Sequence, residues 1–572
     1  MGDRARRLFC LAVVIATLAC GSSRQETRAS DPSASPPRAE RRIAGAFLSD
    51  PPALVSVVAQ VTSGGRNSFG LPEMRHVINS GLTIVQEANR VQARLAETLP
   101  SIENGLWRVL PDGRMETTFT IKEGVRWHDG VPFSPADLLF TADVVRDRDI
   151  PLVRDVAFDL VDEIAVVSPH TITVKWASPY IDADNLFEGR LLIPKHILGG
   201  PYAEDKSTFL YHPYWTTEYI GLGPFKVREF ERSSHLILDA NPDYVLGRPK
   251  IDGIDIKFFL DPNALAANLL AGAVDVTIGQ SLSLETGLHV AAQWSSGRIE
   301  TSPQAAGLPM HIFPQFINPN PPVMLDVRFR RALYHAMDRQ ELIDLQMSGR
   351  AVLADGILWD PGSREWPDIE ARVARHPFDP QRAGQLLESI GYSRGSDGFL
   401  HEANTNAKLS VELRTLTSFD SAVKAIFPIA SYWERVGVGV ETLVVPQQLQ
   451  NDRQYRAERP GFDLAISPRD LTRHHSAEVA LPENAFRGAN RARYSNPAYD
   501  AMIDRYFTTI PWKERMEALG QVVSHMTDQV TVMGIYFDIA PVMVANRLVG
   551  VKGRPGGTEV WNIHDWELRV SS

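Results

Sequence analysis

The stretch GLGPFK at residues 221–226 places two glycines and a lysine close together, as in a phosphate-binding loop. Such a loop aims backbone N–H groups at phosphate oxygens from the start of a helix. Pro224 has no N–H to donate. The following residues alternate partly between apolar and polar types around ERSS, which predicts two strands of a hairpin rather than a helix. We therefore interpret Gly221 and Gly223 as turn glycines.

Two histidine-containing groups are the other candidates for chemistry. His128 and Asp129 are adjacent, but WHDGVPF places Asp-Gly between extended segments, which is typical of a turn. His474 and His475 lie near Glu478, yet adjacent histidines point apart on a regular backbone and no cysteine assists a metal site. The sequence contains neither G-x-S-x-G nor H-E-x-x-H. We expect no catalytic residue, no cofactor and no metal site, and hence no enzyme.

The N-terminus predicts export. MGDRARR precedes the uncharged run LFCLAVVIATLAC, which is too short for an ordinary membrane span and suits a signal-peptide core. Ala19 precedes Cys20, an arrangement that resembles the bacterial lipoprotein signal, although Thr17 stands where an aliphatic residue is usual. Cleavage would leave Cys20 as the one remaining cysteine, which excludes an intramolecular disulfide. We expect a signal peptide over 1–19 and a lipid on Cys20; an ordinary cleaved signal with an incidental cysteine is the alternative.

Residues 20–42 are rich in Ser, Pro and charge and poor in large apolar side chains, so we expect a disordered tether. The rest of the chain is long enough for several domains. The formal net charge is −10, and removal of residues 1–19, with three arginines and one aspartate, makes it −12. This charge and the lack of a basic block exclude nucleic acid as the expected partner.

Capping signals predict the elements of the body. Asp-Pro or Asn-Pro opens three helices, and two more follow Ser134 and Asp326. The five expected helices lie at 134–145, 261–272, 326–337, 379–391 and 496–506. Period-two alternation predicts strands at 114–121, 171–176, 253–259 and 408–416. Two apolar runs, at 308–325 and 530–545, contain proline and read as buried strands. The fold class is α/β, with helices and strands mixed as in α+β proteins.

Five motifs together carry a family resemblance. The first, within residues 95–145, has Lys122, Gly124, Trp127, His128, Asp129, Gly130, Pro132, Phe133 and Asp137. The others are GLGPFK with NPDY, LDVRFRRALYHAMDRQELI, FDPQRAGQLLESIGY and YSNPAYDAMI. In this order they resemble the oligopeptide/dipeptide-binding class of extracytoplasmic solute-binding proteins, which deliver ligand to ABC importers. The matches run from about residue 50 to Trp566.

The resemblance implies a two-lobed, periplasmic-binding-protein-like fold. Lobe one would comprise 43–309, with an inserted subdomain at about 80–200, and a return at 536–572; lobe two would comprise 310–535. The chain would cross between lobes near LPMHIFPQFI and MGIYFDIAPVM, and hinge closure would enclose the ligand.

The implied function is capture of a peptide or related small solute for an ABC permease and its ATPase subunits. The protein would be a lipid-anchored monomer in the periplasm or at the cell surface. The alternatives are an extracytoplasmic sensor or chaperone on this fold, or a binder of a non-peptide solute such as an oligosaccharide or metal chelate.

One departure concerns the ligand. The resemblance implies an acidic residue in a lobe-two loop, ahead of the Asn-Pro helix, that pairs with a peptide's amino group. Here the loop lacks the common Trp-rich, Asp-Pro-Asp pattern, and Asp470 is the nearest candidate. Asp463 is less suited because FDLAI reads as a buried strand. Arg469 and Arg473 flank Asp470 and favour an anionic ligand group. We expect Arg469, Asp470 and Arg473 to bind ligand.

Overall fold

The structure, a computed structural model, describes residues 40–62, 70–85, 90–152, 156–189, 191–279, 281–301, 308–450, 452–553 and 558–569. The expected signal peptide, Cys20 and nearly all of the expected tether lie outside the described residues. The tether boundary needs a correction, because strand β1 (Arg42–Phe47) begins at Arg42. The Arg42 guanidinium donates to Asp239 at 2.7 Å and to Asp255 at 2.6 Å, so this residue belongs to the folded body.

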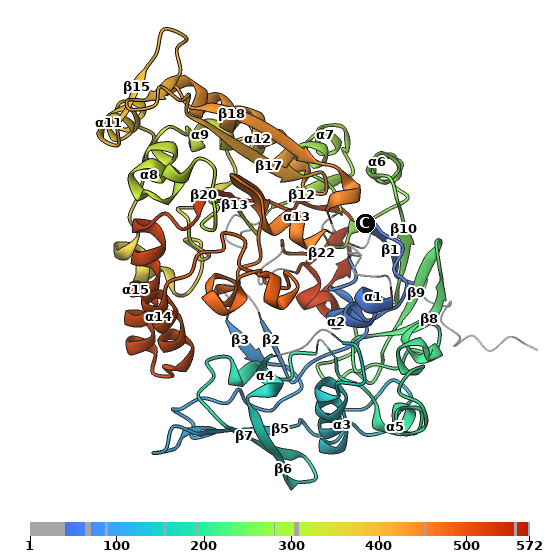
Figure 1. Ribbon diagram of the computed structural model, residues 1–572. Coiled ribbons are helices and arrows are strands. Elements are labelled where there is room, and N and C mark those ends of the chain that lie inside the picture. Colours follow the sequence, from blue (N-terminus) through green and yellow to red (C-terminus); the bar gives the residue numbers. More distant parts are fainter. Residues whose placement is uncertain are drawn as a thin grey trace, which may run out of the picture. The chain divides into compact units, whose positions relative to one another are not determined.

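A mixed sheet organises what we call lobe one, the described residues of 41–301 and 542–569 (Figure 1). β1 lies parallel to β10 and β11, whereas the other neighbours are antiparallel. Its strands, in spatial order, are β12 (Gly297–Glu300), β21 (Val542–Ala545), β11 (Val276–Thr277), β1, β10 (Gly253–Phe258), β9 (His235–Ala240) and β8 (Phe225–Glu231). Phe47, Leu238, Ile254 and Ile256 are fully buried in its core.

A smaller antiparallel sheet belongs to the same lobe. Its order is β4 (Trp107–Val109), β5 (Met115–Thr120), β7 (Thr171–Trp176) and β6 (Val161–Ser168). The alternation that predicted β5 and β7 follows from burial, since Phe119, Ile172, Val174 and Trp176 all point into one core. The short pairs β2 (Thr83–Val85) with β3 (Val91–Ala93) and β22 (Leu548–Val549) with β23 (Glu567–Leu568) complete the strands of this lobe that the structure describes.

Two helices of lobe one begin at the capping signals that predicted them. Ser134 and Asp137 form the expected capping box of α3, and Asp261 accepts a hydrogen bond from the Asn263 amide at the start of α6. The helices are α1 (Ser56–Thr62), α2 (Met74–Val77), α3 (Pro135–Arg146), α4 (Val156–Asp159), α5 (Lys195–Glu204), α6 (Pro262–Leu270) and α7 (Leu284–Gln293).

A second mixed sheet organises lobe two, the described residues of 308–537 (Figure 1). Its order is β14 (Val352–Leu353), β20 (Met533–Phe537), β13 (Pro309–Phe313), β19 (Phe462–Ile466), β17 (Ser410–Leu416) and β18 (Gly439–Val445). The hairpin of β15 (Tyr392–Arg394) and β16 (Leu400–Glu402) lies apart from it. One face of the sheet, with Met310, Ile312, Leu413 and Leu464, packs into an apolar core.

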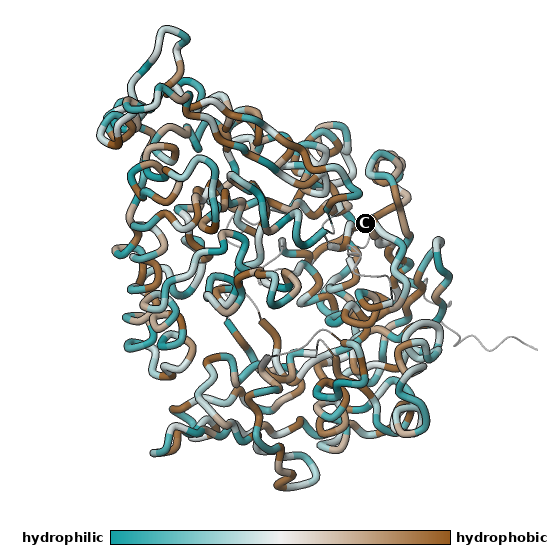
Figure 2. The backbone as a smooth tube through the Cα atoms, viewed as in Figure 1, coloured by the Kyte–Doolittle hydropathy of each residue, from teal (hydrophilic) through white to brown (hydrophobic). Residues whose placement is uncertain are grey.

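Helices of lobe two begin at the predicted caps. The side chains of Asp326, Asp379 and Asn496 accept hydrogen bonds from backbone amides at the starts of α8, α11 and α14. The helices are α8 (Val327–His335), α9 (Arg339–Met347), α10 (Trp366–Ile369), α11 (Pro380–Ser389), α12 (Asp420–Arg435), α13 (Arg453–Ala457), α14 (Pro497–Thr508) and α15 (Trp512–Asp528). Along the tube in Figure 2, hydrophobic and hydrophilic residues alternate, as expected when each element buries one face.

The chain passes between the two sheets at the two predicted stretches. β12 lies in the first sheet and β13 in the second; β20 lies in the second and β21 in the first. β13 and β20 are antiparallel neighbours, so the two passages meet side by side. Among the described residues, no helix is long and apolar enough to cross a membrane.

Candidate functional site

Hydrogen bonds join the His128 turn to the GLGPFK turn, and we call this set of contacts the lock. The His128 ring contacts both glycines: Nδ1 accepts from the Gly221 amide at 3.1 Å, and Nε2 lies 3.0 Å from the Gly223 carbonyl. The His128 amide also donates to the Gly221 carbonyl at 3.0 Å. Burial lowers the pKa of His128 to about 4, so the ring is neutral. Both motifs therefore contribute to the folded structure of lobe one.

Asp129 completes this turn. Its Oδ1 accepts from the Val131 amide at 3.0 Å, and its Oδ2 lies 2.7 Å from His196 Nε2. Gly130 has a φ of 91°, a left-handed conformation that suits glycine. These contacts agree with the predicted turn.

The predicted ligand-binding residues lie in the loop after β19. Arg469 Nη1 lies 2.5 Å from Asp360 Oδ2, and the Asp360 side chain is only 2% exposed. The guanidinium also lies 4.9 Å from the centre of the Phe537 ring at the end of β20. Arg469 thus ties this loop to the segment after β14 and to one of the two crossing strands.

The Asp470 carboxylate is engaged within its own loop. Oδ1 accepts from the Thr472 amide at 3.0 Å and from the Thr472 hydroxyl at 2.5 Å, and so caps the 3-10 helix Leu471–His474. Oδ2 lies 3.2 Å from Arg473 Nε, in a pair of which both side chains are about 40% exposed. Binding of ligand by Arg469, Asp470 and Arg473 stays a prediction.

The second acidic candidate, Asp463, is buried in β19 and pairs with Arg491 at 2.9 Å. Burial alone would raise its pKa, but Arg491, Arg459 and Arg414 outweigh burial and lower it. Asp463 is therefore the charged centre of an internal arginine cluster. The sequence placed it in a buried strand but contained no sign of its partner, which is 28 residues away.

The side chains of the adjacent His474 and His475 lie in different surroundings. His474 is buried, which lowers its pKa to about 4, whereas His475 lies 3.5 Å from Asp504. Within the described ranges, no group of three His, Cys, Asp or Glu side chains is placed to hold a metal ion. His474 instead lies near His311, a buried β13 residue whose Nδ1 is 3.2 Å from the Ser467 hydroxyl.

A cavity of about 320 Å³ lies in lobe one, in the size range of small-molecule sites. Its walls come from α1, the end of α3, α4 and residues within 180–189 and at 191. The wall combines apolar side chains, among them Leu152, Phe158, Phe187 and Leu191, with the polar side chains of Gln60, Asp182, Asn185 and Glu188. Sequence reasoning missed this cavity, because isolated apolar residues look the same in a core and in a pocket wall.

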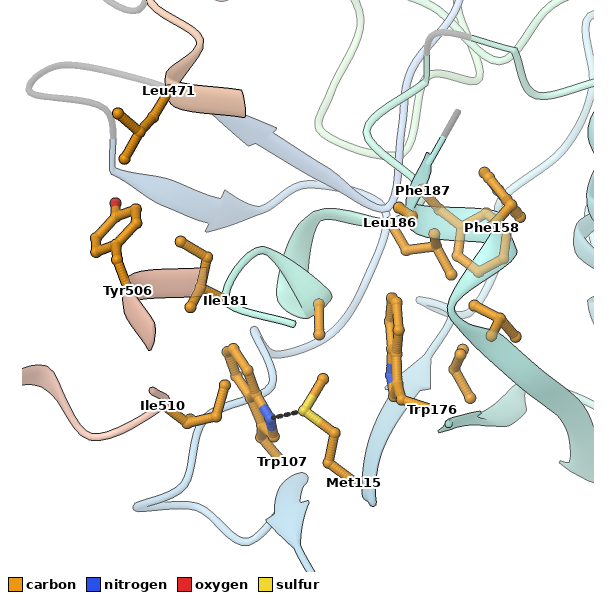
Figure 3. Packing of buried hydrophobic residues seen from close by; sticks show 14 of the residues in the cluster. Trp107, Met115, Phe158, Trp176, Ile181, Leu186, Phe187, Leu471, Tyr506 and Ile510 are labelled. Atoms are coloured by element: carbon orange, nitrogen blue, oxygen red, sulfur yellow. Dashed lines mark hydrogen bonds between the residues drawn. The ribbon is translucent and has the colours of Figure 1, made fainter. Parts of the chain in front are cut away.

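The two lobes meet next to this cavity. Ile181 and Trp107 of lobe one share an apolar cluster with Tyr506, Ile510 and Leu471 of lobe two, and Figure 3 shows these side chains gathered in one region. Leu471 belongs to the same loop as the predicted ligand-binding residues. The loop therefore approaches lobe one near Ile181, which lies between the cavity-wall residues Tyr180 and Asp182.

Charges also face each other at this contact. Burial and the charge of Asp182 raise the pKa of Asp184 to about 7, while Arg364 and Arg515 of lobe two act in the opposite direction. Both arginines lie over the Trp512 ring, at 4.6 and 5.2 Å. Asp182 lines the cavity and also acts electrostatically on Arg515 of lobe two, so this residue borders both the cavity and the interlobe contact.

Known proteins share this architecture. The oligopeptide-binding protein AppA of Bacillus subtilis is 23% identical over 507 residues, covering 87% of each chain. Its structure in complex with a nonapeptide matches with a TM-score of 0.68 and 20% identity, over 93% of this chain and 100% of that one. NikZ from Campylobacter jejuni in complex with Ni(L-His) matches with a TM-score of 0.71 and 18% identity, over 92% and 99%. These structural similarities show the two-lobed fold.

The family model of bacterial extracellular solute-binding proteins, family 5 Middle, matches residues 93–471, which is more than half of the chain. That range includes four of the five motifs, now located at the β5–α3 turn, the start of β8, α8 and α11. The relatives are solute-binding proteins rather than enzymes. The chain therefore belongs to the bacterial extracellular solute-binding proteins of family 5.

Proposed function

We propose that this protein captures a peptide or a related small solute outside the cytoplasmic membrane and delivers it to the permease and ATPase subunits of an ABC importer. The observation that carries the proposal is the family match over residues 93–471, combined with two lobes joined by adjacent crossings at β13 and β20. A two-stranded connection permits hinge closure around a ligand. Capture and release require no catalytic group.

The anchor is part of the same proposal. A signal peptide over 1–19, a lipid on Cys20 and a tether that ends before Arg41 would hold a monomer beside its permease. Lobe one, comprising 41–309 and 536–572, and lobe two, comprising 310–535, are proposed as the two rigid bodies of the closure motion. The domain limits and the lipid are supported by the sequence pattern alone.

A non-peptide solute is the second candidate. The observation that favours it is the pairing of Asp470 with Arg473, because a carboxylate already engaged by an arginine is a poor partner for a peptide ammonium. A neighbour of known structure holds a nickel–histidine complex, so the fold accepts ligands other than peptides. A sensor or chaperone role would use the same binding step without an importer.

Native mass spectrometry of the purified protein tests the proposal. A solute enclosed between closed lobes dissociates slowly, so we expect an added mass that disappears under mild denaturation, and fragmentation would identify it. A mixture of short peptides, added to protein stripped of ligand, provides the second measurement. If no mass is retained from the cell and no peptide binds, the peptide proposal is wrong.

A further inference from the structure

A second, much smaller cavity lies in lobe two, beside the predicted ligand-binding loop. Its volume is about 20 Å³, room for roughly one or two water-sized groups. The polar side chains in its wall are Ser467, Arg473, His474, Asn490 and Arg491. This wall contains no carboxylate. The wall thus combines two cations and three neutral polar groups with the apolar residues Phe313, Pro468 and Ala489.

Each of the two guanidinium groups is only partly used. In the described part of the chain, the side-chain hydrogen bonds of Arg473 involve Nε alone, toward Asp470, and those of Arg491 involve Nη1 alone, toward Asp463. A guanidinium has five N–H donors in a planar fork. N–H donors of both arginines therefore remain for a group in the cavity. Asp470 and Asp463 partly neutralise Arg473 and Arg491, but neither carboxylate lines the cavity.

Three further arginines lie near Arg491 and its partner Asp463. Arg414, Arg456 and Arg459 surround Asp463, and Arg491 acts electrostatically on both Arg456 and Arg459. Burial and these like charges lower the pKa of Arg456, and that of Arg459 to about 9, although Asp463 acts in the opposite direction. Among the described residues, Asp463 and Glu412 are the carboxylates that act on these arginines, so four positive charges face two carboxylates, and an added anion would relieve the repulsion.

We infer that the cavity between Arg473 and Arg491 receives a carboxylate group of the ligand. The inference rests on the proposed function and specifies the chemistry that the site selects. A carboxylate fits because its two oxygens accept paired N–H donors from guanidinium groups. An ammonium group would face two cations instead. The volume admits only the head group, so the rest of the ligand lies outside, past the exposed Pro468 and Arg473.

Arginine footprinting tests the cavity without assuming a peptide ligand. Phenylglyoxal modifies accessible arginines, and mass spectrometry measures the rate at each position. We expect acetate, at constant ionic strength, to slow modification of Arg473 at least threefold, whereas its uncharged isostere acetamide has no effect. Arg487 is the matched control, because it is an exposed arginine ahead of the same Asn-Pro helix and does not line the cavity. Equal rates at Arg473 with and without acetate overturn the inference.

A variant pair tests the same group on a larger ligand. Arg473→Gln removes a half-exposed charge, whereas loss of Arg491 would remove the hydrogen-bonded partner of the buried Asp463 and endanger folding. Calorimetry would compare tetraalanine with its C-terminal amide. We expect wild type and Arg487→Gln to prefer the acid about tenfold or more, and Arg473→Gln to prefer it less than about threefold.

The two tests separate the inference from the proposed function. If the preference for the acid survives in Arg473→Gln, the carboxylate does not enter this cavity and the inference is wrong. If tetraalanine binds to none of the proteins, the peptide proposal loses support, and acetate footprinting alone decides whether the cavity selects a carboxylate.

Discussion

Gly221→Ala perturbs the lock between the His128 turn and the GLGPFK turn. An added Cβ would lie 1.9 Å from the Ile78 carbonyl oxygen and 3.0 Å from its carbon, distances at which backbone must move. The neighbouring Gly223 amide donates to that same oxygen at 3.2 Å. The substitution therefore forces apart two buried backbone segments that glycine alone lets approach.

The magnitude follows from two contributions. Overpacking a well-packed site typically costs about 1–3 kcal/mol. Displacement of residue 221 also strains its two hydrogen bonds with His128 and the Gly223 contact with Ile78, each worth about 0.5–1.5 kcal/mol net. We expect the free energy of unfolding of lobe one to fall by about 3–5 kcal/mol.

Urea unfolding followed by tryptophan fluorescence and by native-state hydrogen exchange would measure this change. The control is Gly384→Ala in α11, where a Cβ meets nothing within 4 Å, so we expect a gain of about 0.5–1 kcal/mol from helix propensity. A Gly221→Ala protein within about 1 kcal/mol of wild type would refute the lock, because that loss is the average for any substitution.

Three further predictions concern acidity, the loop and the anchor. Burial lowers the pKa values of His128, His311 and His474 to between about 3 and about 4, below the unfolded value near 6.5. Their contribution to stability is complete above pH 6.5 and is lost as the pH falls toward 4, by about 2 kcal/mol per histidine at pH 5; a urea midpoint unchanged from pH 8 to 5 would contradict this. Asp470→Asn keeps an oxygen for the Thr472 amide, so we expect calorimetry to show that tetraalanine binds the variant at least as tightly as wild type. A loss of affinity of about thirtyfold or more would indicate instead that Asp470 binds the ammonium group of the peptide. Labelled palmitate should enter the wild type and not Cys20→Ser, and equal labelling of both would exclude Cys20 as the lipid site.

Local chemistry alone determined many elements. Asp261, Asp379 and Asn496 cap the helices that the sequence predicted, because a cap satisfies amides only two or three residues away. Alternation predicted β5 and β7 for a similar reason, since each strand carries its own buried face. The two crossings that the family resemblance implied also occur, at β13 and β20.

Only the tertiary structure decided which charges are available to a ligand. The sequence shows Arg469, Asp470 and Arg473 in one loop, but the partner of Arg469 is Asp360, 109 residues away. Asp463 and Arg491 are likewise brought together by the sheet and the following loop. The availability of a charge depends on the groups that folding places within a few ångströms of it, and sequence spacing does not encode that distance. The composition of the loop was therefore readable from the sequence, whereas the cavity between its arginines exists only in the folded chain.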